Sequence, residues 1–111
     1  MTSTPADLEK LLAADVVTLA GQAFVATFTG VKLGGNSASG KVLKSVRQQF
    51  GNPRWTDANY HVFEAVSLEI QLVFEQARVA VRMSTGQLKL LPRGARLLNA
   101  PDPASALREL L

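Results

Sequence analysis

The sequence predicts a small α+β domain, in which helices cover one face of an antiparallel sheet of about four strands. Three observations support this fold class. The 111 residues are enough for one domain, 1–111, and too few for two that each bury a core. Apolar residues make up 47% of the chain, which is enough to fill such an interior. Along the chain, the patterns predict a helix, a strand, a helix, a run of antiparallel strands and a final helix.

The first helix is expected to begin at Thr4 and Pro5. The threonine hydroxyl can accept from free amides, proline suits the first helical position, and Asp7 interacts favourably with the helix dipole. This helix should end before Gly21. Residues 22–33 are rich in Phe, Val and Thr and alternate in polarity, so they are predicted to form one strand or two short ones.

A second, basic helix is predicted over residues 39–50. Ser37 or Ser39 is expected to cap it, and Gly51 to end it. Its apolar positions recur every three to four residues, as on one helical face. They are Ala38, Val42, Leu43, Val46 and Phe50. Its solvated face carries Lys41, Lys44 and Arg47.

Residues 62–83 fit two patterns. Strict alternation around Ile70 predicts strands, whereas a helical stripe through the same residues predicts a mostly α protein with a long helix over residues 57–84. We favour strands because a helix would leave Leu68 and Leu72 exposed and because β-branched residues are dense here.

The last third of the chain contains two clearer signals. Thr85 and Gly86 lie between two apolar runs, as in a hairpin turn. Asp102 and Pro103 are typical of a helix start. The short helix that follows is expected to expose an apolar edge for protein contacts, formed by Leu107, Leu110 and Leu111.

Composition excludes several kinds of site. The chain has no cysteine, which rules out disulfides and thiolate metal sites, and His61 is its one histidine. Asp7 and Glu9 lie where a signal peptide is basic, and the uncharged run 16–31 is shorter than the ~20 residues of a membrane helix. We therefore expect a cytoplasmic chain with no membrane partner.

A glycine-rich stretch, GGNSASGK at residues 34–41, fits the spacing of a phosphate-binding loop. In such loops a Ser or Thr that follows the lysine binds magnesium, but here Val42 takes that place. No parallel sheet with a second magnesium ligand is expected in so short a chain. We therefore expect no nucleotide cofactor, and interpret the stretch as a turn before a helix.

No catalytic or metal constellation emerges from the remaining residues. Asp57 and Glu64 flank His61 at helical spacing, a pattern more typical of a surface histidine than of a metal site. No serine has the context G-x-S-x-G. The chain is predicted not to be an enzyme, and neither a metal nor a cofactor is expected.

Two functional classes remain. The first is a binding or assembly module that contacts a protein partner or itself, as a homo-oligomer, through the leucines of the last helix. The second is a protein that binds the backbone of DNA or RNA through the basic helix. Its candidate anion-binding residues are Ser39, Gly40, Lys41, Lys44, Arg47, Arg54 and Trp55. The net charge of +3 is modest for that role, so the interaction module comes first.

Overall fold

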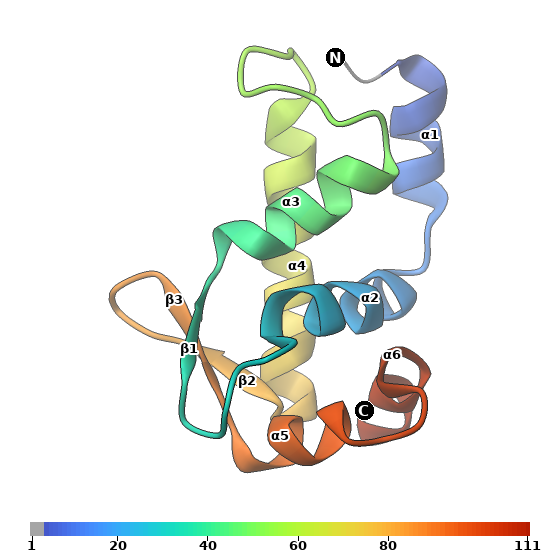
Figure 1. The fold of residues 1–111 in the computed structure, drawn as a ribbon. Coiled ribbons are helices and arrows are strands. Elements are labelled where there is room, and N and C mark those ends of the chain that lie inside the picture. The colour runs from blue at the N-terminus through green and yellow to red at the C-terminus, as the bar shows by residue number, and fades with distance from the viewer. Residues whose placement is uncertain (1–3) are drawn as a thin grey trace.

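A computed structural model describes residues 4–111, and within them six α-helices and a three-stranded antiparallel sheet form an α+β fold (Figure 1). The elements are α1 (Pro5–Ala13), α2 (Val16–Phe28), β1 (Asn36–Ala38), α3 (Gly40–Gln49), α4 (Tyr60–Ala77), β2 (Ala80–Arg82), β3 (Gln87–Leu90), α5 (Pro92–Leu98), α6 (Pro103–Ala106) and the 3-10 turn η1 (Leu107–Leu110). The predicted fold class is confirmed, with three strands in these residues instead of about four.

The start of α1 is as the sequence predicts. The Thr4 hydroxyl accepts from the amide of Asp7 at 3.1 Å, and the Asp7 carboxylate accepts from the amide of Thr4 at 2.9 Å. This reciprocal pair satisfies two amides that have no partner within the helix. The bond from the Thr4 amide is also the main reason why the pKa of Asp7 lies below its usual range.

The strands predicted over residues 22–33 are wrong, because α2 continues to Phe28. The aromatic residues that suggested alternation, Phe24 and Phe28, are four residues apart, so they also share one face of a helix. Both are fully buried. Position 21 lies within this helix, and it suits only glycine because the backbone carbonyl of Ala104 occupies the space that a Cβ would need.

The strands predicted over residues 62–83 are also wrong for most of that range. The segment forms α4, whose buried face includes Phe63, Ile70 and Phe74, and only the end of the range belongs to β2. The helix of the alternative interpretation is therefore present but shorter than 57–84. Leu68 and Leu72 are exposed, as a helix requires. Neither this exposure nor the density of β-branched residues prevents the segment from being helical.

The sheet has the order β1-β3-β2. In its register Ser37 pairs with Leu88, and Ala80 pairs with Leu90. These four side chains are all buried, so one face of the sheet is directed into the domain, where α4 contacts β2 and both α2 and α3 contact β1. The predicted hairpin turn joins β2 to β3, with Gly86 at a φ of 84°.

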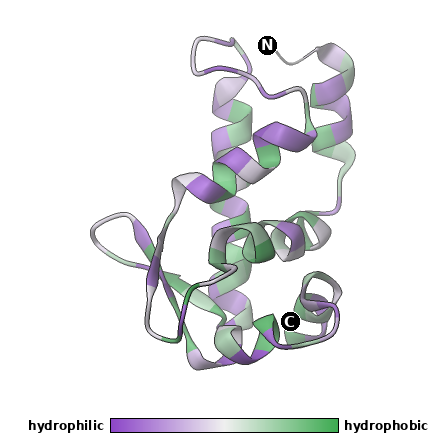
Figure 2. Cartoon of the chain, in the orientation of Figure 1, coloured by the Kyte–Doolittle hydropathy of each residue, from purple (hydrophilic) through white to green (hydrophobic). Residues whose placement is uncertain are grey.

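The core lies between α2, α4 and the sheet. The rings of Phe24, Phe28 and Phe74 are in mutual contact, with centroids 5.1 to 6.4 Å apart. Leu11 from α1 and Leu107 from η1 complete this interior. Hydrophobic residues are concentrated on α2 and along α4, whereas α3 is largely hydrophilic (Figure 2).

The C-terminal turns are tied to the start of α2 by an ion pair. The Asp15 carboxylate accepts from the Arg108 guanidinium, from the amide of Val17 at 3.2 Å and from the hydroxyl of Thr18 at 3.1 Å. The bond from Arg108 is the largest cause of the lowered pKa of Asp15, and the bond from Val17 comes next.

Replacing Arg108 by glutamine is therefore expected to raise the pKa of Asp15 toward its ordinary value of about 3.9. A carboxylate whose folded-state pKa is depressed adds stability above its unfolded-state pKa, and this stability is lost as the pH falls through the folded-state value. The variant should lose less stability below about pH 4 than the wild type. Carboxyl titration by NMR measures the shift.

The pKa of Asp7 is the internal control for this titration, because its lowering comes chiefly from Thr4 and should be the same in both proteins. An unchanged titration midpoint for Asp15 would contradict the role given to Arg108.

Within residues 4–111, no single helix is long and apolar enough to cross a membrane. Among these residues, only α1 and α2 taken together have the length and apolar composition of a membrane span, and a bend of 99° separates the two helices.

Candidate functional site

The glycine-rich stretch 34–41 turns the chain and then pairs with the sheet. The amide of Gly34 donates to the carbonyl of Leu90 at 3.1 Å, and residues 36–38 form strand β1. Ser37 is buried, and its hydroxyl donates to the carbonyl of Thr27 at 2.8 Å. Ser37 therefore does not cap the following helix, and much of this stretch is engaged in the sheet.

The basic helix predicted over residues 39–50 is confirmed as α3, and its N-terminal end is open to solvent. Ser39 occupies the cap position without a side-chain cap bond, and the amide of Val42 donates to its carbonyl at 3.0 Å. Gly40 is exposed, with no heavy atom within 4 Å of the position a Cβ would take. Ser39 and Gly40 line a shallow hollow of about 340 Å³. The other lining residues are Leu43, Glu64, Ser67, Leu68, Gln71 and Arg82.

The three cations of α3 have different environments. Lys41 and Lys44 are exposed, and together with Gln48 they line a hollow of about 240 Å³ beside Ala26 of α2. Arg47 is half-buried and acts within the fold. Its Nε donates to the carbonyl of Pro53 at 2.8 Å.

The guanidinium of Arg47 also lies over the ring of Tyr60, 5.7 Å from its centroid. Because both contacts hold the loop of residues 50–59 against the domain, Arg47 is a structural residue as well as a predicted anion ligand.

Arg54 and Trp55 lie in this loop, beyond the C-terminal end of α3. Both are exposed, the indole of Trp55 to 80%. Since α3 has ten residues and a helix rises about 1.5 Å per residue, roughly 15 Å of helix separates Lys41 from this loop. The predicted nucleic-acid residues therefore extend along α3 into the loop, with Lys41 at one end, Arg54 and Trp55 at the other, and Arg47, bonded to Pro53, between them.

The apolar edge predicted for the C-terminal helix needs a correction. Leu107 is fully buried in the core and is unavailable to a partner. Leu110 is half-buried and Leu111 is 53% exposed. The reason is that η1 packs against α2, which places Leu107 in the hydrophobic core, while Arg108 beside it forms the exposed ion pair with Asp15.

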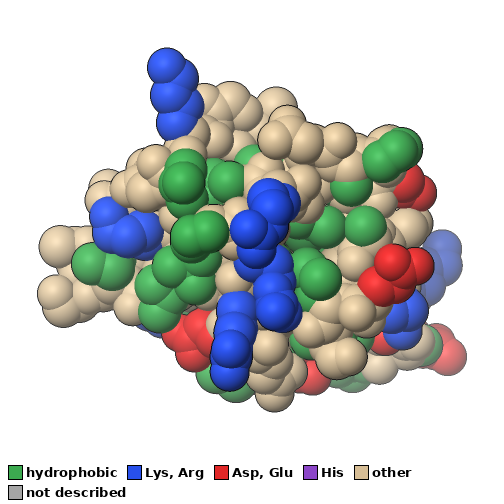
Figure 3. All heavy atoms as spheres, turned by 90° about the horizontal axis from the view of Figure 1, so that it is seen from below, with side chains coloured by type: hydrophobic (Ala, Val, Ile, Leu, Met, Phe, Trp, Pro, Cys, Tyr) green, Lys and Arg blue, Asp and Glu red, His purple; other side chains and the backbone are tan. Residues whose placement is uncertain are grey.

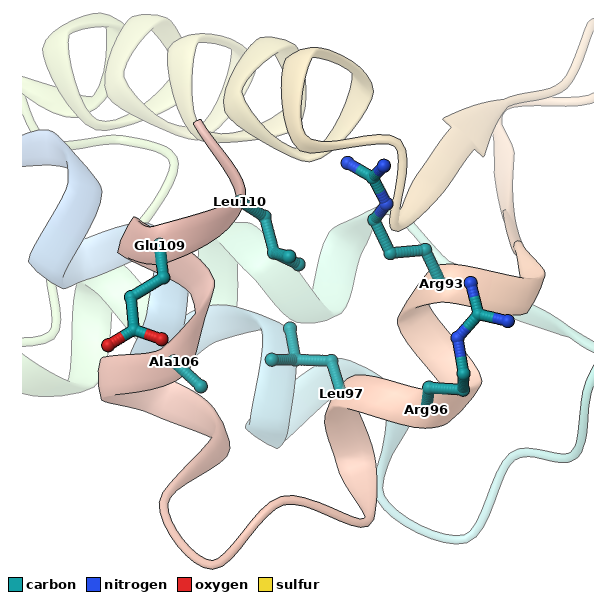
Figure 4. Close-up of a pocket in the computed structure, with 6 residues that line it drawn as sticks. All are labelled: Arg93, Arg96, Leu97, Ala106, Glu109 and Leu110. Carbon is teal, nitrogen blue, oxygen red and sulfur yellow. The ribbon is translucent and has the colours of Figure 1, made fainter.

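Leu110 belongs to a hollow of about 450 Å³ between α5 and η1, which we name the α5 hollow. It is lined by Arg93, Arg96, Leu97, Ala106, Glu109 and Leu110. The side chains of Leu97 and Leu110 face each other across it, the two arginines rise on one side, and Glu109 lies on the other (Figure 4). Seen from below, basic side chains cross this part of the molecule between patches of hydrophobic side chains (Figure 3).

The outer side of α4 carries a second exposed surface, which we name the α4 face. It consists of Glu64, Leu68, Leu72 and Glu75, whose spacing places them along one side of a helix. Leu68 is 49% exposed and Leu72 is 57% exposed. Neither glutamate forms an ion pair with any residue that the structure describes.

Sequence reasoning missed the α4 face as a candidate site. The sequence does contain a signal for this surface, since the helical pattern places Leu68 and Leu72 on the solvent-exposed side of the helix. Two leucines on the exposed side of a helix also indicate an apolar surface that a partner can cover.

No cluster of potential metal ligands accompanies these surfaces in residues 4–111. His61 is exposed on the first turn of α4, and neither it nor any other described residue belongs to a group of three or more potential metal ligands.

Comparisons with protein-family models, with curated proteins and with solved structures each found no significant match. The function of the chain is therefore inferred from the chemistry of its exposed surfaces, which are the cationic side of α3, the α5 hollow and the α4 face.

Proposed function

We propose that this chain is a non-enzymatic module that binds a protein partner through the α4 face. The observation that carries the proposal is the exposure of Leu68 and Leu72, one helical turn apart, on the longest helix of the domain. Protein partners commonly recognise a helix through apolar residues at this spacing. Burying the exposed halves of the two leucines would contribute on the order of 2 kcal/mol to association.

The order of the elements supports the idea that one side of α4 is available to a binding partner. The connectivity resembles that of winged helix-turn-helix domains. The elements concerned are α2, β1, α3, α4 and the hairpin of β2 and β3, with β3 between β1 and β2 in the sheet. In helix-turn-helix proteins the second helix of the pair enters the major groove of DNA. Here the link between α3 and α4, residues 50–59, is longer than the usual three- to four-residue turn.

The residues of α4 favour a protein partner over DNA. The helix contains no lysine or arginine and has three glutamates, Glu64, Glu69 and Glu75. Phosphate groups are bound chiefly by basic side chains, so an acidic helix with exposed leucines would be repelled by a nucleic-acid backbone. An apolar stripe bordered by charge is instead typical of a protein interface.

Binding of a DNA or RNA backbone is the second candidate function. It is favoured by the exposure of Lys41 and Lys44 beside a hollow on α3, and by the exposed Arg54 and Trp55 in the loop that follows the helix. The hollow lined by Lys41 and Lys44 includes no residue of the α4 face, whereas Ser39 and Gly40 share a hollow with Glu64 and Leu68. The two functions can therefore be tested separately at the lysines.

Photocrosslinking in the cells that produce the protein tests both proposals. A photoreactive amino acid at Leu72 probes the α4 face, and the same group at Gln48 probes the hollow lined by Lys41 and Lys44. We expect defined protein adducts from position 72 that are absent from position 48. Adducts from position 48 that disappear after nuclease treatment would support nucleic-acid binding.

The absence of any protein adduct from position 72, with the photoreactive chain folded and at normal abundance, would contradict the proposed function. Circular dichroism of the purified variants provides the folding control, because both positions are exposed and should tolerate the substitution.

A further inference from the structure

We propose that the partner of the α4 face is the α5 hollow of a second copy of this chain, so that copies associate head to tail. This inference rests on the proposed function and specifies its partner. The two surfaces share no residue, both have apolar side chains, and only the α5 hollow has arginines.

The first argument is charge complementarity. The α4 face ends in two carboxylates, Glu64 and Glu75, with no ion-pair partner among the described residues. The α5 hollow has Arg93 and Arg96, which are three residues apart and therefore neighbours on one helix, while its one carboxylate, Glu109, lies on the opposite side (Figure 4). A single guanidinium can bind a carboxylate through two parallel hydrogen bonds, so either arginine can bind a glutamate one turn beyond the leucines.

The second argument is the match between the apolar parts. Leu97 and Leu110 form the apolar floor of the hollow, beside Ala106 (Figure 4). The hollow is open to solvent and has a volume of about 450 Å³. The leucines of the α4 face can therefore be buried on an apolar surface while the carboxylate meets the arginines at its edge.

A symmetric dimer of two α4 faces is disfavoured by the same charges. Whether the two helices run parallel or antiparallel, the order Glu64, Leu68, Leu72, Glu75 places a carboxylate of one copy opposite a carboxylate of the other. Like charges that face each other weaken an interface. A contact between different surfaces avoids this repulsion, and repeated contacts of this kind form rings or chains.

Mixing two variants that each lack one surface tests the inference. The face variant carries Leu68→Glu and Leu72→Glu, and the hollow variant carries Arg93→Glu and Arg96→Glu. By light scattering, the wild type should assemble as its concentration rises, and each variant alone should associate at least about tenfold more weakly. An equal mixture should form a one-to-one complex, because each variant retains the surface that the other has lost.

Two further variants make this result specific. Lys41→Glu with Lys44→Glu changes the net charge as much as the hollow variant does, on a surface outside the proposed contact, and should assemble like the wild type. Arg93 also donates to the carbonyl of Ala77 at 3.3 Å, so the double change could disturb the end of α4. Arg96→Glu alone leaves that bond in place and should weaken assembly in the same direction.

Three results would overturn the inference: a wild type that stays monomeric at every concentration, a dimer that survives in the hollow variant, or an assembling wild type whose two variants do not combine. None of these three results would by itself contradict protein binding by the α4 face. A protein adduct at position 72 with a different partner would leave that function standing while removing self-association.

Discussion

Replacing Phe74 by alanine is expected to lower the free energy of unfolding by about 3–5 kcal/mol. Phe74 is fully buried on α4, and its ring lies 5.6 Å from that of Phe24 and 6.4 Å from that of Phe28. Removing it takes away the aromatic contact between α2 and α4 and leaves a cavity that surrounding residues fill only in part. Since small domains are stable by about 5–15 kcal/mol, this is a large share of the total.

Urea unfolding followed by circular dichroism measures this loss, and the melting temperature should fall by roughly 10–25 °C. Gln76→Ala is the matched control, because Gln76 is exposed on the same helix and its change should alter stability by less than about 0.5 kcal/mol. A loss below about 1 kcal/mol for Phe74→Ala would mean that the ring is not packed as described.

Replacing Gly94 by alanine is expected to cost about 3 kcal/mol or more, a large effect for one methyl group. Gly94 is buried in α5, and an added Cβ would overlap the carbonyl oxygen of Val79 and lie 2.8 Å from Cδ1 of Leu90. The Val79 carbonyl cannot easily give way, since it accepts from the amide of Leu91 at 3.0 Å. The backbone of α5 would have to move away from the sheet.

Gly40→Ala is the control for this prediction, because it makes the same chemical change with the opposite expected sign. No atom lies within 4 Å of the added Cβ, and alanine is the better helix former, so stability should rise by up to about 1 kcal/mol. If Gly94→Ala unfolded at the same urea concentration as the wild type, α5 would not lie so close to Val79. Because α5 forms the hollow with Arg93 and Arg96, a displaced α5 should also weaken self-association.

Local signals were sufficient wherever a few neighbouring residues decide the conformation. The start of α1 at Thr4, the start of α6 at Asp102 and the hairpin turn at Gly86 follow from capping and turn chemistry, and all three are present. The basic helix α3 was also predictable, since its apolar spacing fits a helix alone. Its exposed cations Lys41 and Lys44 lie where the pattern places them.

Periodicity was insufficient where apolar residues fit both a helix and a strand. In α2 and α4 the spacing of Phe24 and Phe28, or of Ile70 and Phe74, suits either conformation. The strand interpretation also required every leucine to be buried, a condition that folded domains do not meet. The choice was made by the packing of α2 against α4 around three aromatic rings.

The sequence alone determined the α+β class, the starts of α1 and α6, the hairpin and the absence of thiol chemistry, because these depend on composition or on residues adjacent in the chain. Only the tertiary structure decided which side chains reach solvent. It buried Leu107, engaged Arg47 with Pro53, and left Leu68 and Leu72 exposed. Exposure depends on which segments far apart in the chain pack together, and no local pattern contains that information.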